Sequence, residues 1–316
     1  MSSETKFDVV GVGACNADLF TYTKVMPVRG QTLTGTAFAQ GWGGKNHNQV
    51  LQAAMLGSRT AVVSHVSDDA YGRGFVANFA ALHCATEGVG VAPASQCSTG
   101  VASITVDADG GNCIVIVPGA NELVTATFVE QHRALLERAT VLVTQLEVPL
   151  AATIRALEIG HASARTTTIF NPAPADTVLP DSIYALCDIV IPNETEAALL
   201  TGVAVNDAAS AEQAARLLLA KGAKNVIVTL GSQGCLLVPG AAAAAIHVPA
   251  AKVTAVDTTG AGDSFIGALA HCLAHGDSLE VAAKRAVACA SFSVQRKGTQ
   301  ASFATIADIG RLGLWQ

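Results

Sequence analysis

Short apolar runs rich in β-branched residues alternate along this chain with segments of helical periodicity. The apolar runs lie at Phe7–Val12, Ala61–Ser64, Val141–Thr144, Thr168–Phe170, Ile189–Ile191 and Val226–Thr229. Helices are predicted between them, around residues 48–57, 70–82, 126–138, 150–160, 194–201 and 210–221. Strands that are apolar on both faces are typical of parallel sheets covered by helices. We therefore predict an α/β fold, a three-layer sandwich with a mostly parallel central sheet.

Two segments, residues 31–40 and 99–117, carry strand-like residues with no helix between them. Within the second, a Gly-containing turn at residues 109–112 separates two apolar runs and predicts a hairpin. Such pieces can form a small separate β-sheet that acts as a lid, or they can be ordinary edge strands of the main sheet. We favour a lid built from about residues 14–43 and 97–121. The lid is part of a single domain that comprises residues 1–316.

Composition limits the class of protein. Half of the 316 residues are apolar (50%) and 14% are charged, which supports a large core. The net charge of −6, with no Lys/Arg-rich run, argues against a nucleic-acid partner. No apolar run reaches the roughly 18 residues of a membrane span, and Met1–Lys6 does not resemble a secretory signal. We expect a cytoplasmic protein without a membrane partner.

Eight cysteines are scattered along the chain, and none forms a Cys-x-x-Cys pair. In a chain of this length, that pattern predicts reduced and mostly buried thiols rather than a zinc site or a disulfide framework.

The most informative motif is Asp-Thr-Thr-Gly-Ala-Gly-Asp at residues 257–263. Residues 253–256 before it are predicted to form a short strand, and Phe265–Leu273 after it has helical spacing. Free backbone N–H groups at such a helix start make an anion site, and Asp263 is placed to accept a proton beside it. This combination suggests phosphoryl transfer to an alcohol. The alternative is an acidic residue that only caps the helix.

Polar residues also follow the first predicted strand, at Asn16 and Asp18. Ligands of parallel α/β sheets bind at the carboxyl ends of the strands, and an amide with a carboxylate suits the hydroxyl groups of a sugar. An Asx turn leaving the strand is the alternative explanation.

A second glycine-rich turn, Gly43-Gly44-Lys45, enters the helix that carries Asn48. Close backbone approach together with the Lys45 and Asn48 side chains would suit a polyhydroxylated ligand. His47 is expected to be packed or on the surface rather than to bind a ligand.

Carboxylates end two more strands, at Glu147 and in Asn193–Glu196. They are suited to Mg²⁺ held through water, although helix capping explains Asn193 and Glu196 equally well. The glycines of Thr229–Gly234, after a further strand, permit backbone contact with phosphates.

From about Val10 to Ser302 the chain resembles the carbohydrate kinases of the ribokinase type. The resemblance rests on the motifs above and on Ser98–Gly100, Gly119–Asn121, Asn171–Ala175 and Arg296–Gly298. It implies a ribokinase-like fold, a homodimer formed through the β lid, and ATP-dependent phosphorylation of D-ribose at O5. It makes Asp263 the general base, and the amides of Gly260, Ala261, Gly262 and Asp263 the groups that hold the charge of the phosphoryl group.

The same resemblance assigns the binding residues. Sugar contacts fall to Asn16, Asp18, Gly44, Lys45, Asn48, Glu147 and Asp263. ATP contacts fall to Asn193, Thr229, Gly231, Ser232, Gly234 and Gly262, with Mg²⁺ held through water by Glu196. An activating K⁺ is expected on carbonyl oxygens of Asp257, Thr259, Ser293, Arg296 and Gly298, with the Ser302 side chain as a further ligand.

One departure from the family pattern is Asn46-His47, where glycine and a small residue usually follow the lysine. Asn46 is expected to tolerate a positive φ angle, and His47 to add bulk near the sugar pocket or the lid hinge. The acceptor therefore stays open among ribose, another pentose or deoxyribose, a ketohexose such as fructose, and a nucleoside. A catalytically inactive sugar or nucleotide sensor is a further alternative. Gly11-Val12-Gly13 lacks the third glycine of a dinucleotide-binding dehydrogenase.

Overall fold

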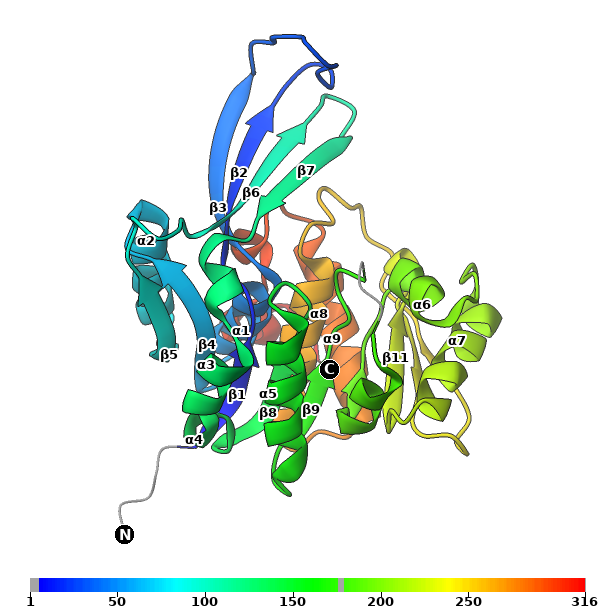
Figure 1. Cartoon of the computed structure of the whole chain (residues 1–316). Helices are drawn as coiled ribbons and strands as arrows, with labels where there is room; N and C mark the ends of the chain where they lie inside the picture. Colours follow the sequence, from blue (N-terminus) through cyan, green and yellow to red (C-terminus); the bar gives the residue numbers. More distant parts are fainter. Residues whose placement is uncertain (1–5, 176–178, 316) are drawn as a thin grey trace.

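A nine-stranded sheet forms the centre of the computed structural model, which describes residues 6–175 and 179–315 (Figure 1). Its strand order is β13-β12-β11-β10-β9-β8-β1-β4-β5, parallel except at the β11–β12 and β12–β13 pairs. The strands are β1 (Phe7–Val12), β4 (Thr60–Ser67), β5 (Ala85–Ala92), β8 (Ala139–Thr144), β9 (Thr167–Phe170), β10 (Ile189–Val190), β11 (Asn225–Thr229), β12 (Cys235–Val238) and β13 (Ile246–Val248). The predicted α/β class and mostly parallel sheet are confirmed.

Helices cover both faces of this sheet, because successive strand residues point to opposite sides. On β1, Val9 packs in the cluster with α8 and α9, and Val10 packs on the other face with α5. The helices are α1 (Lys45–Met55), α2 (Ala70–Ala81), α3 (Ala126–Gln131), α4 (Arg133–Leu136), α5 (Leu150–Ala162), α6 (Glu194–Thr201), α7 (Ala208–Ala220), α8 (Ala261–Ala274), α9 (Leu279–Ser293) and α10 (Ile306–Leu312). The three-layer sandwich is confirmed.

A separate four-stranded sheet stands above the main body in Figure 1. Its order is β3-β2-β6-β7, made by β2 (Asn16–Tyr22), β3 (Ala37–Gly43), β6 (Gly100–Val106) and β7 (Asn112–Val117). The predicted small separate sheet, here called the lid, is therefore confirmed, and its strands are not edge strands of the main sheet. It leaves the body at the carboxyl end of β1, which places β2 next to the edge where ligands of such sheets bind.

Several boundaries differ from the predictions. The strand expected at residues 253–256 is absent, because Val256 is exposed and its N–H donates to the Val294 carbonyl after α9 instead of to a strand. Within 31–40, only the part from Ala37 onward is a strand, and the helix expected over 126–138 is divided at His132. The predictions missed β5, β12 and β13 as well as the strand character of β2.

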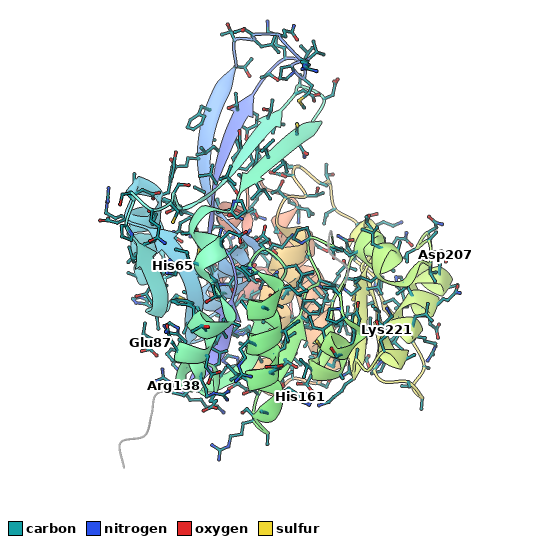
Figure 2. All side chains as sticks on the ribbon, viewed as in Figure 1. His65, Glu87, Arg138, His161, Asp207 and Lys221 are labelled. Atoms are coloured by element: carbon teal, nitrogen blue, oxygen red, sulfur yellow. The ribbon has the colours of Figure 1, made fainter. Side chains whose placement is uncertain are left out.

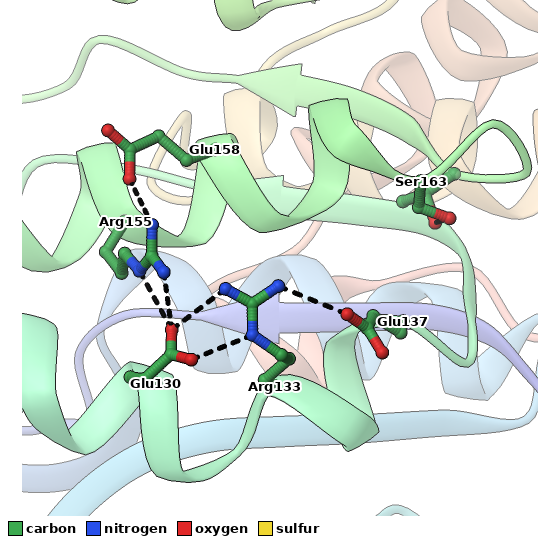
Figure 3. Close-up of polar contacts among 7 residues, drawn as sticks. Glu130, Arg133, Glu137, Arg155, Glu158 and Ser163 are labelled. Atoms are coloured by element: carbon green, nitrogen blue, oxygen red, sulfur yellow. Dashed lines mark hydrogen bonds and ion pairs between the residues drawn. The ribbon is translucent and has the colours of Figure 1, made fainter.

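Ion pairs link α3 and α4 to α5. Glu130 of α3 accepts hydrogen bonds from Arg133 and from Arg155 of α5, and Glu137 and Glu158 complete the network (Figure 3). The arginines lower the pKa of the Glu130 carboxyl. These side chains are half-exposed, so the network contributes little to the free energy of folding.

One ion pair lies far from the lid. Figure 2 shows Glu87 and Arg138 at the end of the body opposite the lid, where they form an ion pair.

All eight cysteines are free thiols and six of them are buried, as the sequence predicts. Among the described residues, no helix is both long and apolar enough to cross a membrane. Residues Met1–Thr5 of the N-terminal segment considered above lie outside the described range.

Candidate active site

The motif at residues 257–263 is a loop that ends in the start of α8. Gly260 is the N-cap with φ 76°, a conformation that favours glycine. The Ala261 N–H donates to the Thr258 carbonyl at 3.2 Å, so one of the four amides assigned to the phosphoryl group is already engaged. Within the described chain, the amides of Gly260, Gly262 and Asp263 have no hydrogen-bond acceptor. The start of this 14-residue helix therefore still offers N–H groups to an anion.

The Asp263 carboxylate lies in the first turn of α8 and is only 9% exposed. Its Oδ2 accepts from Asn48 Nδ2 at 2.9 Å, and its Oδ1 accepts from Gln49 Nε2 at 2.9 Å. Burial raises the pKa of Asp263, whereas Lys45 and the two amides lower it. The group is therefore a buried carboxylate with enhanced basicity, which suits a general base.

Two glycines allow α1 to start beside the lid. Gly44 has φ 88°, and a Cβ atom there would lie 2.7 Å from the Ala14 carbonyl oxygen. A Cβ atom at Gly43 would lie 2.2 Å from Oδ2 of Asp18. Glycine is thus required at position 44 for the close approach of the backbone, whereas at position 43 it makes room for the Asp18 side chain. The Lys45 N–H then donates to Glu147 Oε2 at 2.6 Å, which joins α1 to the segment after β8.

The start of β2 brings two further predicted residues to the same place. Asn16 Nδ2 approaches Glu147 Oε1 at 3.5 Å, and its own Oδ1 accepts from Asn121 Nδ2 at 2.8 Å. Asp18 is 8% exposed, and burial together with Glu147 and Asp263 raises its pKa to about 7. Near neutral pH this carboxyl can therefore donate or accept a hydrogen bond.

Carboxylates outnumber cations in the site. The buried environment lowers the pKa of the Lys45 ammonium, but Asp263, Glu147 and Glu196 outweigh this and raise it. Burial in turn raises the pKa of Glu147 and of Glu196. Lys45 is therefore the cation that these carboxylates share.

A cavity of about 180 Å³ lies between Asp263 and the strand ends. Its lining contains residues from α1, α6, α8 and the ends of β9, β10 and β11. These residues are Lys45, Asn171, Ala173, Ile191, Asn193, Glu196, Thr229, Gly260, Gly262, Asp263 and Ile266. Two residues that the sequence assigns to the sugar, Lys45 and Asp263, thus meet residues assigned to the nucleotide at one cavity. The other predicted sugar residues do not line it: Asn16, Asp18, Gly44, Asn48 and Glu147.

The start of α6 forms a complete capping box. Asn193 Oδ1 accepts from the Glu196 N–H at 2.8 Å, and Glu196 Oε2 accepts from the Asn193 N–H at 2.9 Å. Both residues also line the cavity. The two explanations offered by the sequence are therefore compatible, because capping uses only one oxygen of the Glu196 carboxylate.

The segment after β11 only partly reaches this place. Thr229 lines the cavity, whereas Gly231, Ser232 and Gly234 do not. A Cβ atom at Gly234 would lie 2.0 Å from the Val248 carbonyl oxygen, and its N–H and C=O are both bonded within the turn. Close packing against β13 therefore explains Gly234 without any phosphate.

The predicted cation loops are held together by one carboxylate. Asp257 accepts from the Thr259 N–H at 2.9 Å and from the Gly298 N–H at 2.9 Å. Ser302 is fully buried and donates to the Thr299 carbonyl at 2.7 Å. The Ser293 carbonyl accepts from the Arg296 N–H, and Arg296 stacks on Phe292. A Cβ atom at Gly260 would lie 3.1 Å from Thr299 Cγ2, so these segments meet beside the start of α8.

Sequence reasoning missed Gln49, Asn121 and Asn171 as members of the site. Asn121 and Asn171 lie in motifs that the family resemblance includes, but no role was inferred for them. Gln49 follows Asn48 directly, and an unbroken polar run from residue 45 to 49 on a helix facing the core was the available signal.

The departure at Asn46 and His47 has a structural explanation. Asn46 is helical and does not need a positive φ angle, since only Gly44 supplies one in this turn. The His47 ring is fully buried against Phe75 and Phe79, and its Nε2 lies 3.0 Å from Asn78 Oδ1. Burial lowers the pKa of His47 to about 4. The ring does not line the cavity, so the predicted bulk near the sugar pocket is directed toward α2.

Comparison with known proteins agrees with this geometry. The pfkB family carbohydrate kinase model matches residues 6–306. A ribokinase of Mus musculus is 42% identical over 297 residues, covering 93% of this chain and 91% of that protein. A deoxyribokinase of Salmonella typhi is 40% identical over 299 residues, covering 95% and 96%. The structure of Arabidopsis thaliana ribokinase complexed with ribose and ATP has a TM-score of 0.90 at 29% identity, covering 99% of each chain. This chain belongs to the pfkB family of carbohydrate kinases and is a phosphotransferase of the ribokinase type.

Proposed function

We propose that this kinase transfers the γ-phosphoryl group of ATP to O5 of D-ribose. Asp263 takes the proton of the attacking hydroxyl, and the free amides at the start of α8 stabilise the charge on the transferred group. The observation that carries the proposal is the position of the Asp263 carboxylate, buried at a helix start and at the wall of a cavity that also reaches Lys45 and Thr229.

Ribose recognition is assigned to the polar groups around Lys45. Asn16, Asp18, Asn48 and Glu147 supply amide and carboxylate groups next to Asp263, which match a ligand with a hydroxyl on nearly every carbon. Asp18 adds a carboxyl that can act as donor or acceptor near neutral pH.

We assign the nucleotide to the side of the cavity formed by Asn193, Glu196 and Thr229. Mg²⁺ would arrive with ATP and be held through water near the Glu196 oxygen that capping leaves free. Gly231 and Ser232 lie in the turn that follows β11, and we assign them to the part of the nucleotide that extends past the cavity. Gly234 is the weakest of the assigned contacts, since packing explains it.

A K⁺ ion is assigned to the loops that Asp257 joins. Carbonyl oxygens of Asp257, Thr259, Ser293, Arg296 and Gly298, with Ser302 beside them, form a donor set that suits this ion. A cation there would fix the loop before α8 and so aim the amides of Gly260 and Gly262.

We further propose a homodimer formed through the lid. Asp18, Ala102 and Ile116 lie side by side in the lid sheet, so Ile116 shares the face that carries Asp18. Ile116 is 47% exposed and Ile114, two residues earlier, is 51% exposed. A second lid would cover these side chains. Light scattering of the native protein and of Ile114→Asp tests this, and a native monomer would contradict it.

Deoxyribose is the second candidate acceptor, because the deoxyribokinase of Salmonella typhi is nearly as similar to this chain as the mouse ribokinase. A coupled assay with ATP, Mg²⁺ and K⁺ compares ribose, deoxyribose, fructose and a nucleoside by kcat/KM. We expect ribose to give the highest value. Higher kcat/KM for deoxyribose would reassign the acceptor, and no sugar-dependent release of ADP would contradict the kinase proposal altogether.

A further inference from the structure

Beside the Asp263 carboxylate lies a buried chain of amides that no role above uses. Gln49 Nε2 donates to Asp263 Oδ1 at 2.9 Å, and Gln49 Oε1 accepts from Gln145 Nε2 at 2.7 Å. Both glutamines are 0% exposed. The chain therefore runs from the start of α8 through α1 to the end of β8 without contact with solvent.

The direction of every amide in this chain is fixed. A carboxylate only accepts hydrogen bonds, so Gln49 must turn its Nε2 toward Asp263 and its Oε1 away. Gln145 must then present its Nε2 to that oxygen. Nε2 of Gln49 also lies 3.2 Å from Asn171 Oδ1, and Asn171 in turn donates to the Ile191 carbonyl at 2.9 Å. Both hydrogens of the Gln49 amide thus have acceptors, and the side chain has no second orientation that satisfies its neighbours.

Gln145 is confined in the same way. A Cβ atom at Gly13 would lie 2.3 Å from Gln145 Oε1, so the glycine at the end of β1 makes room for this side chain. Gln145 Oε1 has no hydrogen-bond partner among the described residues. Gln49 is therefore the group that holds the Gln145 amide in this direction.

We propose that Gln49 is a positioning residue that holds the Asp263 carboxylate ionised and in a single orientation, and that Gln145 fixes Gln49 from behind. The inference rests on the proposed role of Asp263 as the base. Asn48 donates a hydrogen bond to Oδ2 on the side of the binding residues, whereas Gln49 donates one to Oδ1 from the protein interior. Since the pKa of Asp263 is raised by burial and lowered by Gln49, loss of the Gln49 amide raises it further.

Other groups titrate around Asp263 and must be separated from it. Lys45 on α1, Asp18 on β2, Glu147 after β8 and Glu196 on α6 all interact with its charge. None of them has a hydrogen bond with Gln49, so their titration is common to native enzyme and variants.

The test compares Gln49→Met with Gln52→Met. Gln52 is a matched control, since it is 0% exposed on the same helix, one turn further on. Its amide donates to the Ala304 carbonyl at 2.8 Å and accepts from Ser264 Oγ at 2.8 Å, without touching Asp263. Both variants lose a buried amide and keep the volume of the side chain. A merely structural role would therefore affect both equally.

For Gln49→Met we expect kcat to fall about tenfold or more, as for the loss of a hydrogen bond to a charged group. The acidic limb of its pH–rate profile should move to higher pH, while that of Gln52→Met stays in place. In an Asp263→Asn background, Gln49→Met should have almost no further effect on kcat. Equal pH–rate profiles for Gln49→Met and Gln52→Met would overturn the proposal. An undiminished effect of Gln49→Met on kcat in the Asp263→Asn background would overturn it as well.

Two further measurements keep the inference testable. Gln145→Met should shift the acidic limb in the same direction by a smaller amount, and it replaces Gln49→Met if that variant does not fold. NMR titration of ¹³C-labelled aspartate, with Asp263 assigned from Asp263→Asn, reads its pKa without turnover. A native enzyme inactive on every sugar would contradict the proposed function, while an unchanged Asp263 titration in Gln49→Met would contradict the role of Gln49.

Discussion

Asp257 and Gly298, 41 positions apart in the sequence, are joined by a 2.9 Å hydrogen bond from the Gly298 amide to the Asp257 carboxylate. The other oxygen of the same carboxylate holds the Thr259 amide. One side chain therefore connects the loop that precedes α8 with the loop that follows α9.

Replacement of Asp257 by Ala removes both of these bonds. We expect kcat to fall about tenfold or more, since two hydrogen bonds to a charged group are lost, and the K⁺ concentration for half-maximal rate to rise. The rate is measured against KCl at constant ionic strength. Asp107→Ala in the lid turn, which also removes a carboxylate that caps backbone amides, is the control. An unchanged K⁺ response in Asp257→Ala would separate these loops from any cation site.

Replacement of Asp263 by Asn keeps the shape of the side chain and removes the base. A fall in kcat of about 10²–10⁴-fold is expected for a general base. Sugar binding, measured by calorimetry, should persist, because Asn16, Asn48 and Glu147 remain. An effect of less than about tenfold would make Asp263 a structural residue.

Asp18→Asn should make the protein more stable at alkaline pH although it weakens sugar binding. The pKa of Asp18 is raised to about 7 in the folded state, above its unfolded value, so its contribution to stability is present at low pH and is lost as pH rises toward 7. The neutral amide avoids this loss, which is of the order of a few kcal/mol at most.

Urea unfolding at pH 5 and at pH 8 measures this effect. The free energy of unfolding of the native protein should decrease between the two pH values by more than that of Asp18→Asn. Equal pH dependence in the two proteins would show that Asp18 is charged in the folded state at pH 5 as well.

His47→Ala should lower stability and leave the sugar preference unchanged. The ring fills space against Phe75 and Phe79, so its removal leaves a cavity that costs about 2–4 kcal/mol. Thermal unfolding measures the loss, and kcat/KM for several sugars measures the preference. A changed order of sugars would return His47 to the binding pocket.

The sequence is sufficient to predict strands whose run of apolar residues is not interrupted. The β1 and β8 strands are apolar on both faces, and this alone predicts their place in the middle of a parallel sheet. In β2, by contrast, the polar residues Asn16 and Asp18 interrupt the apolar pattern, so this pattern does not predict a strand. Residues 253–256 have a strand-like composition, but the Val256 N–H donates to the Val294 carbonyl after α9 and not to a strand.

In the candidate site, too, the sequence predicts some features and not others. The glycines at positions 43 and 44 signal a close backbone approach, yet only the structure shows that the atoms approached belong to Asp18 and Ala14. The role of Gln49 depends on which side of α1 faces α8. That is a tertiary relationship: the polar run at residues 45–49 marks the segment, but it does not show which side chain meets Asp263.

Asn48 and Asp263 meet at 2.9 Å although 215 positions separate them. Neither half of the polypeptide can assemble this pair, because α1 comes from one end of the chain and α8 from the other. Turnover is therefore a reporter of completed folding. In a refolding experiment, enzymatic activity should return only once α1 has docked on α8, and it should not precede recovery of the helical circular dichroism signal.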